Sequence, residues 1–360
     1  MKKNFFIIIL LGFCLLARAQ TTAVLHYLPT LSAEQAEAYR GYDMIVVDHE
    51  VINNSPENLR LMREENPNLK ILVYANKIEW HNPMFLDKPW SLKMVAELKK
   101  YPKWFLKGTN RKKLVFWPGT VLMNCRLDCL RYIINGKSYN YIEYFTEHYI
   151  NDIIGAYQKE GIRLDGLLDD ELLKSISFIG SYGQNHGVDS NSDGKNDNKA
   201  ELNRQWRLGN AYFLKTIRQT MGPDFLIIGN GGHGYYLDWC DGKMFEYFPE
   251  IYLNEADTKT EAWPENMRHA SAMKIALFNA RADNYGHPDN WLFTICSAML
   301  LDNAIFSQGQ NMPYREDYRL NLGQPLGSCE IDTVNGDYFR QFQNGTVYVN
   351  PVSKKGWIAK

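Results

Sequence analysis

The sequence has no excess of either charge. Its 360 residues include 40 Lys and Arg against 41 Asp and Glu, for a formal net charge of −1. Chains that bind nucleic acid concentrate basic residues, so this balance points to no nucleic-acid partner. Hydrophobic residues make up 45% and charged residues 22%, both ordinary for a globular protein. These values exclude a disordered chain, a fibre and a polytopic membrane protein.

Long apolar runs are missing beyond the N-terminus. The basic pair Lys2-Lys3 precedes the apolar run Phe5–Leu16, which is too short for a stable bilayer anchor. The small-x-small segment Ala17-Arg18-Ala19 follows, so residues 1–19 are predicted to be a signal peptide that is cleaved before Gln20. We therefore expect a periplasmic or secreted protein with no stable membrane insertion after cleavage.

Cysteine is scarce. Cleavage of the signal peptide would remove Cys14 and leave five cysteines. An odd number leaves at least one unpaired, which excludes a disulfide framework. Cys125 and Cys129 could pair or bind a metal, but no His or Cys cluster of zinc spacing accompanies them. Small buried thiols are the simpler interpretation.

Short apolar runs alternate with helical patterns along the rest of the chain. The apolar runs are mostly continuous, as in strands buried on both faces. The predicted strands are Ala23–Leu28, Met44–His49, Ile71–Trp80, Leu164–Asp169, Leu226–Gly229, Lys243–Phe248, Lys274–Asn279 and Ala304–Ser307. Eight strands alternating with helices predict an α/β fold of the (β/α)8 TIM-barrel type. The alternative, a doubly wound open sheet, is disfavoured because Tyr27-Leu28-Pro29-Thr30 contains no glycine for a phosphate-binding turn.

Helical periodicity is clearest at Tyr141–Tyr157 and near Asn203–Met221. Further helices fit Ser32–Arg40, Pro56–Asn66, Glu261–Met273 and Asp289–Leu301. We expect residues 20–330 to form the barrel, with 81–138 as a long aromatic-rich insertion after the third strand. Residues 331–360 should form a short β appendage, because Phe339–Asn350 is typical of a hairpin that turns at Asn344-Gly345.

Acidic residues end two of the predicted strands, and catalytic groups of such barrels lie at strand C-termini. Asp169 closes the run Leu164–Asp169, and Glu246 lies in Lys243–Phe248. Glycosidic bond cleavage needs two carboxyl groups flanking the bond, so we predict this pair as catalytic. Each could instead be a structural cap or ion-pair partner. Asp170 or Glu171 could also replace Asp169, since sequence does not place a strand end to one residue.

Amides, aromatic rings and further polar groups accompany these carboxylates and could bind sugar hydroxyls and faces. The predicted substrate-binding residues are Tyr27, Asp48, Tyr74, Asn76, Trp80, Trp117, Asn124, Asn230, Asn279 and Arg281. Either Trp80 or Trp117 is expected to stack on a sugar. The alternative is that all insertion tryptophans are buried against the barrel, and for Trp90 and Trp104 we prefer it.

Residues 189–197 match a calcium-binding loop in part. Oxygen-bearing side chains fall at positions 1, 3, 5 and 9, with Gly194 at position 6. Position 12 is Ala200, and Glu201 comes one residue late. The predicted ligands are Asp189, Asn191, Asp193, the Lys195 carbonyl, Asp197 and Glu201. A polar turn that binds nothing is the alternative. We expect calcium as a structural ion here and no organic cofactor.

Several stretches together resemble a known family. They are Trp104-Phe105-Leu106, Phe116-Trp117-Pro118-Gly119, Met123-Asn124, Asp165-Gly166-Leu167-Leu168-Asp169, Asp189–Asp197, Trp206-Arg207-Leu208-Gly209, Ile228-Gly229-Asn230-Gly231, Phe245-Glu246, Leu322-Gly323-Gln324-Pro325-Leu326-Gly327, and Asn344-Gly345 to Asn350-Pro351. In this order they resemble the bacterial hypothetical glycosyl hydrolase group, which is related to endo-α-1,4-polygalactosaminidase-like barrels. The resemblance covers most of the chain and implies a TIM-type barrel that hydrolyses carbohydrate.

The resemblance also implies roles for the two acids. Asp169 matches the Asp that closes the family's Asp-Gly-x-x-Asp stretch, and Glu246 matches its acidic strand end. By analogy with barrels that act on α-linked sugars, Asp169 would be the nucleophile and Glu246 the acid/base. An inverting enzyme would instead use one of them to activate water. A non-catalytic carbohydrate-binding barrel and a metal-dependent phosphodiesterase with clustered acids at Asp48, Glu50, Asp169 and Asp170 are the competing functions.

Overall fold

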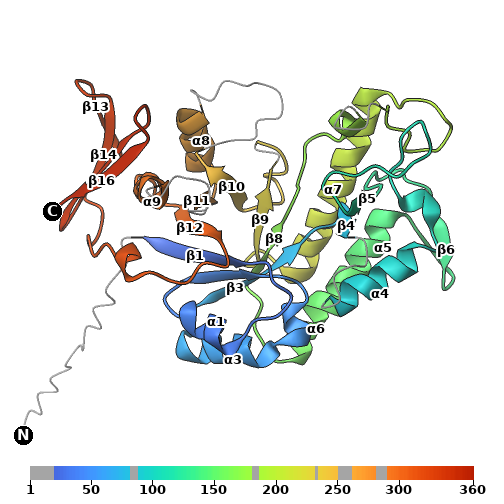
Figure 1. Cartoon of the computed structure of the whole chain (residues 1–360), viewed down its shortest axis with the longest axis horizontal. Coiled ribbons are helices and arrows are strands. Elements are labelled where there is room, and N and C mark those ends of the chain that lie inside the picture. Colours follow the sequence, from blue (N-terminus) through green and yellow to red (C-terminus); the bar gives the residue numbers. More distant parts are fainter. Residues whose placement is uncertain (1–19, 82–87, 181–185, 232–233, 250–261, 281–289) are drawn as a thin grey trace, which may run out of the picture.

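A closed barrel of parallel strands forms the centre of the computed structural model, which describes residues 20–81, 88–180, 186–231, 234–249, 262–280 and 290–360 (Figure 1). Neighbouring barrel strands follow one another in the chain, and the last pairs with the first. The strands are β1 (Thr21–His26), β2 (Met44–Val47), β3 (Lys70–Ala75), β8 (Gly166–Asp169), β9 (Leu226–Asn230), β10 (Gly242–Phe248), β11 (Ile275–Ala280) and β12 (Ala304–Gln310). The protein is therefore an α/β barrel, as the alternating pattern predicts.

Alternate residues of each strand fill the barrel interior. This inner core consists of Ala23, Leu25, Met44, Val46, Leu72, Leu168, Ile228, Met244, Leu277 and Ile305. The residues between them, such as Ile45, Val73 and Leu167, belong to a second core between strands and helices. Both faces of the strands are buried, which explains their continuous apolar sequence.

Helices surround the barrel, and several begin with recognisable caps. Ser32 and Gln35 form a capping box at α1 (Ala33–Ala38), and Asn140 and Glu143 form another at α5 (Tyr141–His148). Pro56 starts α3 (Pro56–Glu65). The remaining helices are α2 (Val51–Asn54), α4 (Pro89–Leu98), α6 (Gly155–Lys159), α7 (Lys199–Met221), α8 (Ala262–Ser271) and α9 (Asn290–Met299). A π-helical stretch, Tyr149–Ile154, joins α5 to α6, so the predicted helix 141–157 is continuous but not uniformly α-helical.

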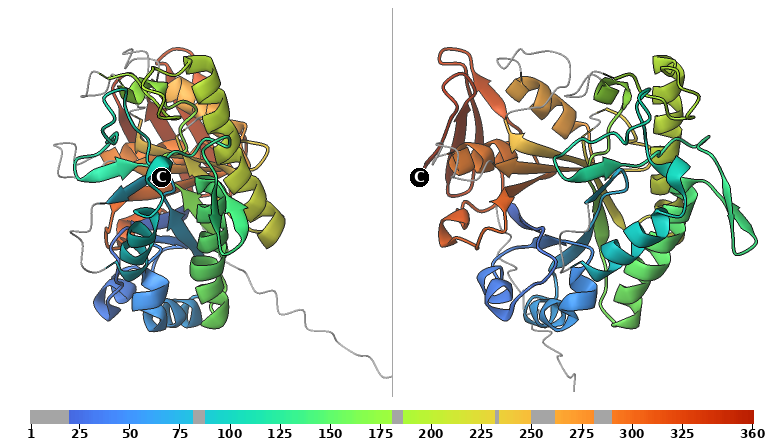
Figure 2. Two further views of the ribbon diagram at one scale, coloured as in Figure 1. Left: turned by 90° about the vertical axis from the view of Figure 1, so that its right-hand side faces the viewer. Right: turned by 45° about the vertical axis from the view of Figure 1, so that its right-hand side comes forward.

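The segment after β3 leaves the barrel and packs beside α5 and α7 (Figure 2). Short strands β4 (Glu79–His81) and β5 (Thr120–Leu122) pair with each other, as do β6 (Tyr132–Ile134) and β7 (Lys137–Tyr139). Helix α7 approaches this segment closely at Gly209, where a Cβ atom would lie 1.7 Å from the Cys125 carbonyl oxygen. Only glycine fits there, so the segment is fixed firmly against the barrel.

A four-stranded antiparallel sheet ends the chain. Its strands are β13 (Glu330–Asp332), β14 (Asp337–Phe342), β15 (Gly345–Asn350) and β16 (Lys355–Ala359). The hairpin expected at 339–350 is its central pair, and β13 and β16 extend it. The sheet packs on α9, because a Cβ on Gly356 would lie 2.9 Å from Cys296 Cβ and the Leu292 carbonyl oxygen.

The described residues contain free cysteines and no membrane-spanning helix. The cysteines at 125, 129, 240, 296 and 329 are free thiols, and the first four are buried. Burial raises the pKa of the Cys129 thiol to about 12. No helix in the described part of the chain is long and apolar enough to cross a membrane.

Candidate active site

Strand residues alternate between the barrel interior and the helix layer, and this alternation also determines which side chains lie at the C-terminal mouth of the barrel. Two residues beyond Leu168, Ile228 and Met244 of the inner core come Asp170, Asn230 and Glu246. Successive strand residues point to opposite faces, so these three continue the inward-facing rows. The backbone N–H of Asp170 still donates to the Ala75 carbonyl at 2.8 Å, which extends the strand pairing past Asp169.

Asn230 joins the two carboxylates. Its Nδ2 donates to Asp170 Oδ1 at 2.8 Å and to Glu246 Oε2 at 3.0 Å. Since one nitrogen contacts both oxygens, they can be no further apart than these two distances together. The Tyr74 hydroxyl donates to the other Asp170 oxygen at 2.5 Å. The site thus holds two neighbouring carboxyl groups, and Asp170 accepts a side-chain hydrogen bond at each of its oxygens.

The surroundings of Glu246 favour its protonated form. Burial, followed by the negative charge of Asp170, raises the pKa of Glu246 above its usual range, although the hydrogen bond from Asn230 opposes the shift. The same two carboxylates and burial hold the pKa of the nearby Tyr27 hydroxyl well above its ordinary value. The rings of Tyr27 and Tyr74 have centroids 4.8 Å apart. The raised pKa of Glu246 favours its protonated form, which is the form that a general acid needs.

Asp169, the residue predicted as nucleophile, has a different environment. It is fully buried, and both its oxygens accept from Lys77 Nζ at 2.7 Å. Because Leu167 faces the helices, Asp169 does too, and the structure does not bring it together with Glu246. The sequence analysis gave an ion-pair partner as the alternative for Asp169, and the buried pair with Lys77 agrees with that alternative. Asp170 is the residue that faces the barrel axis.

A second pair of carboxyl groups lies beside this site, and the sequence did not assign it. The side chains of Glu79 and Glu171 are hydrogen-bonded to each other. Trp117 contacts both: its Nε1 donates to Glu171 Oε1 at 2.9 Å and its backbone N–H to Glu79 Oε1 at 3.0 Å. Asn76 Nδ2 also donates to Glu171, at 3.3 Å. Trp117 and Asn76 are thereby connected to the residue that follows Asp170.

Two other predicted binding residues occupy strand ends of the barrel. Asp48 is buried, accepts a hydrogen bond from the Glu50 backbone and pairs with Lys88 Nζ at 2.6 Å. Asn279 is buried and donates to Ser307 Oγ at 3.3 Å and to the Gly309 carbonyl at 3.2 Å. Asn279 therefore joins the ends of β11 and β12, whereas Asp48 joins the end of β2 to the residue before α4.

Two predicted residues are not at the site described here, and a third cannot be placed. Trp80 is buried among aromatic rings and donates from Nε1 to the Tyr141 hydroxyl at 2.9 Å. Asn124 is buried beneath residues 189–197 and donates to the Ser190 carbonyl at 2.8 Å. Arg281 lies outside the described residues. Of the two candidate stacking tryptophans, Trp117 is exposed and Trp80 is not.

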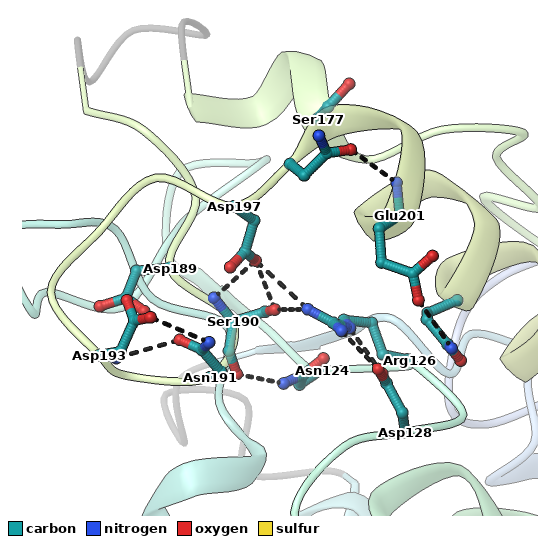
Figure 3. A network of polar contacts seen from close by, with 12 residues as sticks. Asn124, Arg126, Asp128, Ser177, Asp189, Ser190, Asn191, Asp193, Asp197 and Glu201 are labelled. Atoms are coloured by element: carbon teal, nitrogen blue, oxygen red, sulfur yellow. Dashed lines mark hydrogen bonds and ion pairs between the residues drawn. The ribbon is translucent and has the colours of Figure 1, made fainter.

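Residues 189–197 form a compact polar turn on the surface (Figure 3). Asp189 accepts from the backbone N–H groups of Asp193 and Gly194 at 3.0 and 2.9 Å. Asn191 Oδ1 accepts from the same Asp193 N–H, and the Lys195 N–H donates to Asp193 Oδ1 at 2.8 Å. The side chains of Asp189, Asn191 and Asp193 thus gather on one side of the turn.

Of the three remaining predicted calcium ligands, the side chains of Asp197 and Glu201 are paired with arginines. Asp197 accepts from the Ser190 backbone at 2.9 Å and pairs with Arg126 at 3.4 Å, while Glu201 pairs with Arg204 at 2.8 Å (Figure 3). In the described part of the chain, no three His, Cys, Asp or Glu residues are grouped as metal ligands.

Among solved structures, the fold is similar to two sugar-cleaving proteins. It matches the cycloalternan-degrading enzyme from Trueperella pyogenes with a TM-score of 0.50 and 10% identity, over 83% of this chain and 43% of that one. It also matches the α-N-acetylgalactosaminidase NagBb from Bifidobacterium bifidum with a TM-score of 0.50 and 9% identity, over 95% of this chain and 58% of that one. The chain spans less than two thirds of either protein, and at these identities the likeness concerns the fold.

Family membership comes from the sequence itself. A search of curated proteins gave no match. A family model, described as hypothetical glycosyl hydrolase family 15, matches residues 63–346, which include Asp170, Asn230 and Glu246. That match covers most of the chain and agrees with the resemblance noted in its motifs. The chain therefore belongs to hypothetical glycosyl hydrolase family 15.

Proposed function

We propose that the protein is a secreted glycoside hydrolase that cleaves an oligosaccharide or polysaccharide with Asp170 and Glu246. The observation that carries this proposal is the pair of hydrogen bonds from Asn230 to both carboxyl groups at the mouth of the barrel. Asp170 replaces Asp169 in the assignment because Asp169 is enclosed with Lys77. The proposal of secretion rests on the N-terminal segment 1–19, which lies outside the described residues.

The separation of the two acids favours a retaining mechanism. Carboxyl groups of retaining enzymes lie about 5–5.5 Å apart, whereas inverting enzymes leave about 6.5–9.5 Å for a water molecule. The two contacts of Asn230, at 2.8 and 3.0 Å, bring one oxygen of Asp170 close to one oxygen of Glu246, which supports the shorter separation of a retaining enzyme.

In the first step, an Asp170 oxygen attacks the anomeric carbon while Glu246 gives its proton to the departing glycosidic oxygen. The bond between sugar and leaving group breaks as the bond to Asp170 forms. The raised pKa of Glu246, caused first by burial, favours the protonated form that this step needs. Tyr74 and Asn230 orient Asp170 and must weaken their hydrogen bonds as its charge is consumed.

In the second step, Glu246 is a carboxylate and removes a proton from water. The resulting oxygen nucleophile attacks the anomeric carbon and releases Asp170, so that both residues return to their starting states. Because these carboxylates lie on the fourth and sixth barrel strands, as in barrels that act on α-linked sugars, we propose an α-linked substrate.

The test is a screen of oligosaccharides and aryl glycosides, followed by two substitutions. Asp170→Asn and Glu246→Gln should each lower kcat by at least about 100-fold on a substrate that the wild type cleaves. Aryl glycosides with good leaving groups should be less affected by Glu246→Gln, because they need little protonation. Full activity of either variant would remove that residue from the mechanism. Saccharide binding without hydrolysis across the screen would favour a carbohydrate-binding barrel.

We further propose that residues 189–197 bind a structural calcium ion through Asp189, Asn191 and Asp193. Carboxylate and amide oxygens suit calcium, and these three side chains lie together on the turn. Asp197 and Glu201 do not join them in the described structure, because they pair with Arg126 and Arg204.

A further inference from the structure

We propose that Glu79 and Glu171 form a carboxyl–carboxylate pair that holds the Trp117 indole in place as a sugar-stacking surface beside Asp170. The proposal deepens the function given above and rests on it where sugar binding is concerned. Glu79 and Glu171 are positioning residues in this scheme, because they act on substrate through Trp117.

Two hydrogen bonds hold Trp117 at fixed points. The indole Nε1 donates to Glu171 Oε1 at 2.9 Å, and the backbone N–H donates to Glu79 Oε1 at 3.0 Å. The hydroxyl of Thr120 donates to the same Glu79 oxygen and to the Trp117 carbonyl, the latter at 2.8 Å. Trp117 nevertheless remains 55% exposed. A large ring that is exposed yet anchored through its polar edge can offer an apolar face to a ligand.

The two glutamates can approach each other only if one of them carries a proton. Each is at least nine-tenths buried, and their carboxyl groups are hydrogen-bonded to each other. Two ionised carboxylates in such a site would repel each other strongly. Burial, the charge of Asp170 and the charge of Glu79 raise the pKa of Glu171 to about 9, and burial raises the pKa of Glu79. Glu171 is therefore the group that donates.

The surroundings of Glu171 support this assignment. The ionisable groups that interact with it include Asp170, Glu79, Tyr74 and Cys125, and none of these four is a cation. Asn76 contributes a neutral N–H donor at 3.3 Å. These neighbours disfavour a second negative charge, so the pair keeps its proton throughout the neutral range.

Backbone geometry places the pair next to the proposed nucleophile. Glu171 has a φ of +49°, in the left-handed region that non-glycine residues rarely adopt. Through this turn, Asp170 points toward Asn230, whereas the side chain of Glu171 points toward Trp117. The indole is thus connected to the residue directly after Asp170, and a sugar ring packed on it would lie next to the sugar being cleaved.

Spectroscopy without any substrate tests the pair first. The indole ¹⁵N–¹H resonance of Trp117, assigned by its loss in Trp117→Phe, should shift with a midpoint near pH 9. Glu171→Gln should abolish that shift and keep the low-pH position, because the amide accepts from the indole and donates to Glu79 as the protonated acid does. A Trp117 resonance that does not change between pH 6 and 10, or that titrates near pH 4–5, would overturn the pair.

Kinetics on an oligosaccharide from the screen then tests the stacking role. Wild-type KM for a long oligosaccharide should rise at least about tenfold between pH 7 and 10, whereas KM of Glu171→Gln should be independent of pH. Trp117→Ala and Glu171→Ala should raise KM similarly, and the double variant no further. An unchanged KM in Trp117→Ala would overturn the stacking role. If the resonance titrates but the screen finds no hydrolysis, the pair stands and the proposed hydrolase function fails.

Discussion

One residue of register separates a structural acid from a catalytic candidate at the end of β8. Asp169 and Asp170 are adjacent and chemically identical, yet strand alternation directs them to opposite faces. Asp169 follows Leu167 into the layer between barrel and helices and pairs with Lys77 there. Asp170 follows Leu168 into the barrel mouth and contacts Asn230.

This difference predicts opposite consequences for two conservative substitutions. Asp169→Asn should lower the melting temperature by about 5–15 °C, because it leaves the buried Lys77 ammonium without its carboxylate partner. Lys243, which is also buried and whose ammonium has no hydrogen-bond partner among the described residues, would lose the same nearby negative charge. Calorimetry measures the melting temperature of Asp169→Asn and of Asp170→Asn, which is the matched control.

The control should keep a melting temperature near that of the wild type, since Asp170 is only half-buried and asparagine can still accept from Tyr74. If Asp169→Asn instead melts like the wild type and its kcat collapses, Asp169 is the nucleophile after all.

At the scale of elements, the loop 189–197 connects the barrel core to the start of α7. Asp189 is buried, whereas Asn191 and Asp193 are exposed, so an ion bound here would tie the surface turn to an anchored residue. Asp197 instead links the loop to Arg126 of the segment after β3. The loop is therefore held in place partly by protein contacts alone.

Calcium should add to these contacts. Millimolar calcium is expected to raise the melting temperature relative to a chelator by a few degrees, because an ion that binds only the folded state stabilises it. Asp193→Asn should reduce the effect, and Asp332→Asn, at an exposed turn of the C-terminal sheet, is the matched control. If the melting curves with chelator and with calcium are superimposable, the proposal of a structural calcium ion at residues 189–197 is wrong.

At the scale of the whole molecule, the C-terminal sheet is part of the barrel's packing rather than a separate unit. Gly356 lies against α9, and the ring of Tyr338 lies 4.7 Å from that of Trp263 on α8. Arg340 reaches the Met299 carbonyl at the end of α9 at 3.2 Å. The sheet therefore covers the apolar side of two barrel helices.

Removal of residues 330–360 should consequently damage the entire fold. We expect the truncated chain to be largely insoluble or to melt at least about 10 °C lower, because apolar surface of α8 and α9 becomes exposed. Val352→Ser is the control, since that side chain is 93% exposed and contributes little burial. Circular dichroism with thermal melting measures both. A truncated protein with wild-type melting would show that the barrel folds independently of the sheet.

Local pattern was sufficient for the architecture. Continuous apolar runs that alternate with helical periodicity predicted all eight barrel strands, since burial on both faces imposes apolar residues along each strand. The exception in length is the predicted strand Ile71–Trp80, because β3 ends at Ala75 and Glu79 and Trp80 belong to the separate strand β4. In the folded barrel, Asp170, Asn230 and Glu246 each follow an inner-core residue by two positions. Tertiary structure was needed to establish which row of β8 faces inward, because a one-residue shift exchanges the two faces.

Contacts between distant segments were decided only by the tertiary structure. Glu79, Trp117 and Glu171 come from three separate parts of the chain, and no local spacing relates them. Trp80 and Trp117 were both candidates for stacking on a sugar, yet Trp80 is buried against Tyr141 and Trp117 is exposed beside Glu171. The sequence by itself determined the barrel and the residues at its strand ends, because periodic burial is a local property. Which of those side chains meet was decided by how the chain closes on itself, because such contacts depend on register and on the path of the segment after β3.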